Sequence, residues 1–331
     1  MRTVELAHEK WFVDEPASYT ATWSFALDIE SVVLIVGAVA IAGAWWAMAS
    51  RLSRPELARL RPLGRLAPWI PRLLAIHLGV SLLSLAVANS YLAPNLSLDD
   101  VAGGWAVASA EGLLGVWLVS GIRLRPAALV TLVLGPLAWV MAGPVAMLEA
   151  VDLLGIALFL ALLPPGRDLY GAVRPPPEVV RAGLFALRMC VGAALVVLSF
   201  SEKFANPDLA REFIDRYPAF DLFSTLGLPL DSELFIRFAG SVELLFGLLI
   251  MLGAAPQVAM IVAGIPFNAT LFFLGRTELI GHLPIYGAML ALLVYGSSTT
   301  YAREVSGVPS ITGVKALLAE LVPRRSASDE V

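Results

Sequence analysis

The stretch GAALVVLSFSEKFANPDL, residues 192–209, starts as an uninterrupted apolar helix and ends on two adjacent, opposite charges, Glu202 and Lys203. Apolar windows of this kind recur along the 331-residue chain, of which 58% is hydrophobic and only 15% charged. The mean hydropathy is +0.78. Because about 18 or more apolar residues can cross the roughly 30 Å hydrocarbon core as a helix, the sequence predicts a polytopic membrane protein.

We predict an all-α transmembrane helix bundle with nine spans. The fifth span is short for a crossing. The nine spans are expected at about 28–50, 72–92, 104–121, 126–144, 150–164, 183–204, 235–253, 257–274 and 282–298.

Charge in the loops predicts the orientation, because short cytoplasmic loops collect Arg and Lys. The first connection carries Arg51, Arg54, Arg59, Arg61, Arg65 and Arg72, and is therefore expected inside. Alternation from there places the acidic segment 205–234 outside. The predicted location is the cell membrane, with the N-terminus outside and the C-terminus cytoplasmic.

The two ends flank the bundle. Residues 1–27 lack the basic start and early apolar core of a cleaved signal, so they are predicted to be an external leader. Aromatic residues could anchor this leader at the lipid headgroups, namely Trp11, Phe12, Tyr19, Trp23 and Phe25. Within the cytoplasmic tail, 299–331, the pattern over 310–325 suits an amphipathic helix on the inner leaflet, with a partly ordered tail as the alternative.

An internal duplication organises the chain. GVSLLSLAVANSYLAPNL, residues 79–96, parallels residues 192–209. One helix later, SAEGLLGVWLVSG (109–121) and SVELLFGLLIMLG (241–253) share Ser, Glu, Gly and Gly at the same spacing. We therefore predict two parallel four-helix repeats, 72–164 and 183–298, with the span 28–50 as an addition outside them.

The second repeat differs from the first in charge and in its outer connection. When the two repeats are aligned, Glu202 corresponds to Asn89, Lys203 to Ser90, and Arg188 to Ala75. The outer connection 205–234 is longer than its counterpart. It spaces apolar residues by four, which predicts an amphipathic lid over the outer mouth of the second repeat.

Glu243 is the strongest candidate for chemistry. It lies about eight residues from the outer end of its span, roughly 12 Å deep. An ionised carboxylate at that depth must face the bundle, find a partner or hold a proton. Asn268, at a similar depth beside Pro266, is the expected polar partner. Interhelical hydrogen bonding without further function is the alternative.

The other candidates complete a predicted polar pocket. Adjacent residues do not share a helix face, so Glu202 and Lys203 are expected to contact different neighbours. Arg188 and Lys203 could instead snorkel to the membrane surfaces, and Glu111 could be a packing remnant. The candidate catalytic residues are Glu243, Arg188, Glu202, Lys203 and His282, and the candidate ligand-binding residues are Asn268, Tyr286, Ser241 and Glu111.

Several classes of chemistry are not expected. The single cysteine, Cys190, allows neither a disulfide nor a dithiol pair within the chain. His77 and His282 are predicted at opposite membrane faces, so they cannot both ligate one haem. No metal motif, phosphate loop or nucleophile elbow is present. Neither a haem nor a metal cofactor is therefore expected, and nucleic acid is not an expected partner.

The second repeat resembles DoxX-type membrane proteins. The resemblance is carried by LRMCVGAALVVLSFSEKFANP, residues 187–207, and by GSVELLFGLLIMLG, residues 240–253. It covers 183–298 well and the first repeat in degraded form. It implies a four-helix transmembrane unit, and some members of the family are subunits of quinone-linked oxidoreductases acting on thiosulfate.

Two function classes follow. In the first, the chain is a quinone-linked oxidoreductase subunit in which Glu243 exchanges protons and Arg188, Lys203 or His282 orients an oxygen or an anionic donor. No redox centre is encoded, so electrons would pass directly to the quinone or through a redox partner protein. In the second, the same pocket binds a small solute or lipid for transport or assembly.

Overall fold

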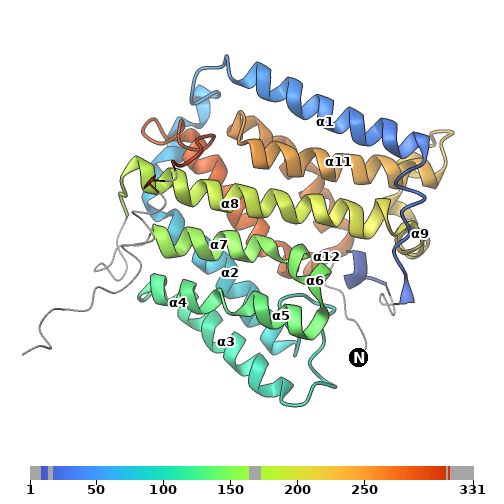
Figure 1. Cartoon of the computed structure of the whole chain (residues 1–331), viewed down its shortest axis with the longest axis horizontal. Coiled ribbons are helices and arrows are strands. Elements are labelled where there is room, and N and C mark those ends of the chain that lie inside the picture. Colours follow the sequence, from blue (N-terminus) through green and yellow to red (C-terminus); the bar gives the residue numbers. More distant parts are fainter. Residues whose placement is uncertain (1–8, 14–17, 164–172, 311, 314–331) are drawn as a thin grey trace, which may run out of the picture.

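The computed structural model describes residues 9–13, 18–163, 173–310 and 312–313. Within these ranges the chain is helical and contains no β-strand. Helices α1, α11, α8 and α7 lie side by side in that order, α4 packs against α7, and α2 and α12 pack behind them (Figure 1). The all-α fold class predicted from the hydropathy is therefore confirmed.

The long helices follow the apolar segments of the sequence. In the part of the chain that the structure describes, six helical segments are long and apolar enough to cross a membrane, namely Ile29–Ala49, Ala58–Val87, Leu124–Ala142, Pro177–Phe204, Ser232–Leu252 and Pro256–Ser297. The helices are α1 (Ile29–Ala49), α2 (Ile70–Val87), α3 (Gly104–Ser120), α4 (Leu124–Thr131), α5 (Leu134–Ala142), α6 (Pro144–Glu149), α7 (Val151–Leu162), α8 (Pro177–Leu198), α9 (Pro207–Arg216), α10 (Leu222–Thr225), α11 (Ser232–Leu252) and α12 (Pro256–Ser297). Since α3 and α7 are shorter apolar helices, the count of nine spans stays a prediction.

Helix α12 folds back on itself at Gly275. This glycine has φ 68° and ψ −136°, outside the helical region. The Tyr286 hydroxyl donates to the Phe267 carbonyl at 2.7 Å, although the two residues are 19 positions apart. A straight helix would separate them by about 28 Å. The two halves of α12 are therefore antiparallel, which matches the two separate spans expected at 257–274 and 282–298.

Two helix pairs cross at glycines in the same way. A Cβ atom built on Gly79 of α2 would lie 2.7 Å from the Gly115 carbonyl oxygen of α3. The equivalent distance from Gly192 of α8 to the Gly247 carbonyl oxygen of α11 is 2.5 Å. Glycine is needed at these positions because any side chain would push the helices apart. The two crossings agree with the predicted duplication, which stays a prediction.

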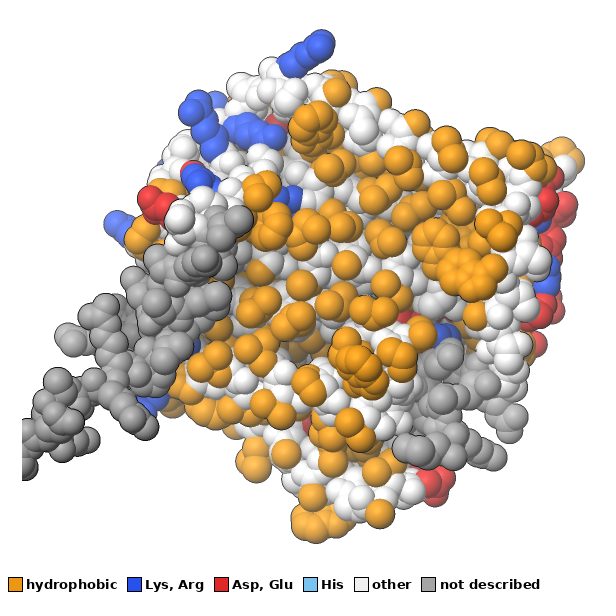
Figure 2. Space-filling model, in the orientation of Figure 1, with side chains coloured by type: hydrophobic (Ala, Val, Ile, Leu, Met, Phe, Trp, Pro, Cys, Tyr) orange, Lys and Arg blue, Asp and Glu red, His pale blue; other side chains and the backbone are white. Residues whose placement is uncertain are grey.

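Charged side chains gather at the two ends of the bundle, and apolar side chains cover the face between them (Figure 2). Lys and Arg lie mainly at one end, and Asp and Glu at the other. The exposed apolar side chains include Val33 at 61%, Ile41 at 56% and Phe272 at 85% exposure. Such a surface suits a lipid bilayer. The cell membrane and the direction of insertion stay predictions.

The segment between α8 and α11 packs over the acidic end of the bundle. Helix α9 buries Leu209 and Phe213 in a cluster with Phe235 of α11. Phe220 makes edge-to-face ring contacts with Phe235, at 6.4 Å, and with Phe273 of α12, at 6.1 Å. We call residues 207–225 the cover of this end; the predicted role of 205–234 as an external lid stays a prediction.

The N-terminal segment differs from the predicted interfacial leader. Glu9 and Lys10 are 4% and 1% exposed, so they lie inside the bundle. Trp11 packs on the ring of His282 at 5.2 Å, rather than anchoring at the headgroups. Trp23 is 59% exposed, as a headgroup anchor would be. The predicted amphipathic tail, 310–325, lies almost entirely outside the described residues.

Candidate functional site

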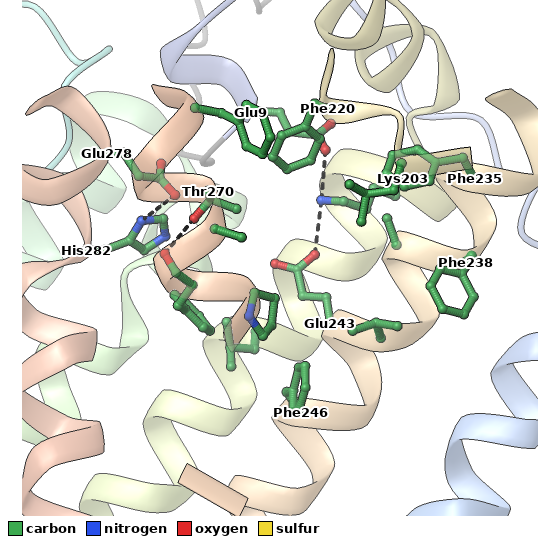
Figure 3. A pocket seen from close by; sticks show the side chains of 18 residues that line it. Glu9, Lys203, Phe220, Phe235, Phe238, Glu243, Phe246, Thr270, Glu278 and His282 are labelled. Atoms are coloured by element: carbon green, nitrogen blue, oxygen red, sulfur yellow. Dashed lines mark hydrogen bonds and ion pairs between the residues drawn. The ribbon is translucent and has the colours of Figure 1, made fainter. Parts of the chain in front are cut away.

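A cavity of about 210 Å³ lies beneath the cover, between α11, the two halves of α12 and the end of α8 (Figure 3). Its walls are mostly apolar and aromatic. The polar lining comes from charged side chains at the end nearest the cover. The residues that line the cavity include Glu9, Lys203, Phe238, Glu243, Phe273 and His282.

An ion cluster centred on Lys203 forms one wall of the cavity. The Lys203 Nζ atom lies 2.9 Å from a Glu9 carboxylate oxygen, 3.1 Å from one of Glu243 and 3.4 Å from one of Glu202. The Glu202 side chain is fully buried, whereas that of Glu243 is 18% exposed. Glu243 is therefore the carboxylate of this cluster that a ligand in the cavity can reach most directly.

A π-helix over Ser199–Phe204 brings Glu202 and Lys203 to the same cluster. In a regular α-helix adjacent residues point about 100° apart, which is why we expected different neighbours. In the π-helix the Glu202 carboxylate and the Lys203 ammonium group lie 3.4 Å apart, and π-helical turns are frequent at functional sites. The expectation that Glu202 and Lys203 contact different partners is wrong for this reason.

The N-terminal segment supplies one carboxylate of the cluster. The Glu9 backbone amide donates to the Glu202 carboxylate, while the Glu9 side chain contacts Lys203. The next residue, Lys10, forms a buried ion pair with Glu149 at 3.0 Å. Glu9 was not predicted from the sequence. Glu9 and Lys10 lie in a polar segment without a hydrophobic periodicity, so nothing in the local pattern indicates that they are buried.

The opposite wall carries a second ionisable pair, Glu278 and His282 (Figure 3). His282 Nδ1 lies 3.2 Å from the Glu278 carboxylate, and both side chains are buried. Sequence reasoning named His282 and missed Glu278. Their spacing of four within one helix was the available signal, but the ninth span was expected to begin at residue 282.

Among the described residues, three carboxylates lie within 3.4 Å of the Lys203 ammonium group. Buried charges are stable only when they are paired and hydrogen-bonded. Glu243, which also lines the cavity, can accept a hydrogen bond from a ligand or pair with a positively charged group of one.

Several predicted site residues lie elsewhere. Arg188 donates to the carbonyls of Met251 and Gly307 at the basic end of α8. Ser241 donates to the Arg237 carbonyl of its own helix. Tyr286 donates to Phe267, and none of these three residues lines the cavity.

Two further predicted residues have other partners. Asn268 is exposed and donates to Gly264 within its own helix, so its expected pairing with Glu243 is wrong; Lys203 takes that place. Glu111 of α3 accepts from the Leu92 amide at 3.1 Å. It is buried there, away from the cavity.

Comparison with known proteins found no family model, no curated protein and no solved structure that matches the chain. The resemblance of 183–298 to DoxX-type membrane proteins therefore stays a prediction.

Proposed function

We propose that the chain binds a membrane-soluble amphiphile in the cavity, with the polar head of the ligand at the Lys203 cluster and its apolar part between α11 and α12. The observation that carries this proposal is one apolar cavity closed at one end by buried charge. Amphiphiles match this combination because apolar walls bind by area and a few polar groups fix the orientation.

Access from the bilayer supports the same ligand class. Phe238 and Phe273 line the cavity and are also 44% and 40% exposed on the apolar surface. A ligand dissolved in the membrane could therefore enter between α11 and α12 without crossing the cover. A water-soluble ligand would have to pass α9 and the N-terminal segment.

A quinone is the preferred ligand class within this proposal. The resemblance to DoxX-type proteins, some of which are quinone-linked oxidoreductase subunits, supports it. A bound quinone supplies two-electron, two-proton redox chemistry. Glu243 would hold and deliver protons at the head of the ligand, Lys203 would orient an oxygen, and a reduced partner protein would supply the electrons.

Binding without catalysis is the second candidate. The Glu243 carboxylate favours it, because this side chain is 18% exposed and lines the cavity, where it could pair with a ligand that has an amine head. Transport or storage of a lipid or small solute would use the same residues. We also infer that α2–α3 and α8–α11 are copies of one helix pair, of which only the second gained the ion cluster.

Ligand titration with a cavity-filling variant tests the proposal. Ala239 lines the cavity on α11, so Ala239→Phe should fill the space for the ligand. Ala40→Phe on the exposed face of α1 is the matched control. A short-chain quinone and a long-chain amine would be titrated, with the melting temperature as readout.

Saturation of the purified protein at about 100 times Kd should stabilise it by roughly 2.7 kcal/mol. We expect this stabilisation in the wild type and in Ala40→Phe, and its loss in Ala239→Phe. Equal stabilisation of all three proteins, or of none, would refute binding in this cavity. Donor-dependent quinone reduction in membranes then supports the redox class, and uptake by protein-loaded vesicles supports transport.

A further inference from the structure

A second cavity, of about 300 Å³, lies at the opposite, basic end of the bundle. It is formed where the C-terminal end of α1, the loop after it, the turn between α11 and α12, and the segment after α12 meet. Its lining residues are Trp46, Ser50, Arg54, Ala254, Arg303 and Ser306. None of them belongs to the Lys203 site.

The walls of this cavity are held in place. Trp45 of α1 donates from its indole nitrogen to the Ala254 carbonyl at 2.9 Å. Ala49 packs on Ala254 and Ala255 in a small apolar cluster. The Arg54 guanidinium donates to the Ser306 hydroxyl at 2.8 Å, which joins the loop after α1 to the segment after α12.

The Arg303 guanidinium brings to the cavity a positive charge that no described carboxylate pairs with. Arg303 is exposed, and no described carboxylate lies within ion-pair distance of it. Arg54 forms a long ion pair with Glu56, at 4.0 Å. Two guanidinium groups with hydroxyl neighbours are the donor set that binds phosphate oxygens best.

The position of the cavity indicates where the phosphate comes from. Trp46 lines the cavity and is 56% exposed on the apolar surface of α1, and tryptophan is enriched at membrane interfaces. The apolar part of α1 ends at Ala49, one residue before Ser50. A phosphate at this depth lies at the level of the headgroups, and basic pockets between membrane helices bind anionic lipid heads.

We propose that this cavity is a binding site for the phosphate head of an anionic phospholipid. Arg54 and Arg303 contact the phosphate oxygens, Ser306 donates a hydroxyl hydrogen bond, and the acyl chains lie along α1 beside Trp46. A bound lipid would join α1 to the α11–α12 turn and to the segment after α12. This assignment is independent of the ligand in the Lys203 cavity.

Native mass spectrometry of the full chain in a neutral detergent tests the site. Phosphatidylglycerol would be titrated against phosphatidylcholine, with glycerol 3-phosphate as the soluble competitor. The variants are Arg303→Gln and Arg54→Gln. Arg59→Gln is the matched control, because Arg59 is exposed near the same end but does not line the cavity.

We expect phosphatidylglycerol to bind roughly tenfold more tightly than phosphatidylcholine, and each cavity variant to weaken it roughly tenfold. The control should weaken it by less than about twofold. Arg303 is exposed, and its side chain makes no ion pair or hydrogen bond with the described residues, so Arg303→Gln should melt as the wild type does.

Three results would overturn the proposal. If phosphatidylglycerol and phosphatidylcholine bound equally well, the site would not recognise the negative charge of the lipid head. If Arg59→Gln and Arg303→Gln weakened phosphatidylglycerol binding equally, the lipid would be attracted by the general positive charge of this end and not by the cavity. Glycerol 3-phosphate binding as tightly as the lipid would assign the cavity to a soluble phosphate compound.

Discussion

Replacing Lys203 by methionine tests whether the ion cluster holds the cavity together. The ammonium group lies 2.9 to 3.4 Å from three carboxylates. At an effective dielectric constant of about 20, each contact is worth about 5 kcal/mol of attraction, most of which offsets the desolvation of the charges. Removing the cation leaves the carboxylates uncompensated, which costs about 3–5 kcal/mol.

The assay is thermal unfolding of the purified protein, followed by tryptophan fluorescence. We expect Lys203→Met to lower the melting temperature by roughly 10 °C. Adding Glu243→Gln to that variant should recover part of the loss, because one of the stranded carboxylates becomes neutral. Arg211→Met is the matched control: its ion pair with Glu233 is exposed, so it should cost less than about 1 kcal/mol.

Two results would refute this reasoning. Lys203→Met could melt within error of the wild type, which would mean that the carboxylates are stable without the ammonium group. Alternatively, Arg211→Met could cost as much as Lys203→Met, which would mean that burial of the cluster adds nothing to its strength.

Three further predictions concern residues outside the Lys203 cluster. Lys10→Met removes the buried ion pair with Glu149, so limited proteolysis should cleave the N-terminal segment roughly tenfold faster, and an unchanged rate would contradict its anchoring. Burial raises the pKa of Glu56 above its ordinary value of 4.5, so folding disfavours the ionised carboxylate. The variant Glu56→Gln, which carries no charge, should therefore melt at a higher temperature than the wild type at pH 7. Below pH 4.5, where Glu56 is protonated, the two proteins should melt alike. Gly247→Leu should cost about 1–3 kcal/mol in thermal unfolding because it forces α11 off α8, whereas Gly37→Leu, which meets open space, should cost far less.

The sequence was informative where a pattern depends only on local burial. Runs of apolar residues indicated long apolar helices, and six helical segments among the described residues are long and apolar enough to cross a membrane. The Gly79–Gly115 and Gly192–Gly247 contacts fall within the two repeated spacings. The chain reverses at Gly275, whose backbone is non-helical and which lies between the two spans predicted at 257–274 and 282–298; the count of nine spans stays a prediction. Hydropathy reports these features because each one is set by residues close together in the chain.

The composition of the site depends on contacts that no local pattern encodes. Glu243 was found because a carboxylate in an apolar helix stands out. Its partner was assigned to Asn268 because the two residues have a similar predicted depth, whereas Lys203 could have snorkelled to the membrane surface; in the structure the Lys203 ammonium group donates to Glu243. Glu9 reaches the cluster from a segment 193 residues away from Glu202, and only the folded chain brings the two together.

Analysis of the lipids that copurify with the protein tests the central claim most directly. An ultraviolet spectrum and mass spectrum of the organic extract would be compared between the wild type and Ala239→Phe. We expect one amphiphile, at about one molecule per chain, to be retained by the wild type and lost from the variant. An identical extract from both proteins would contradict ligand binding beside Lys203 and Glu243.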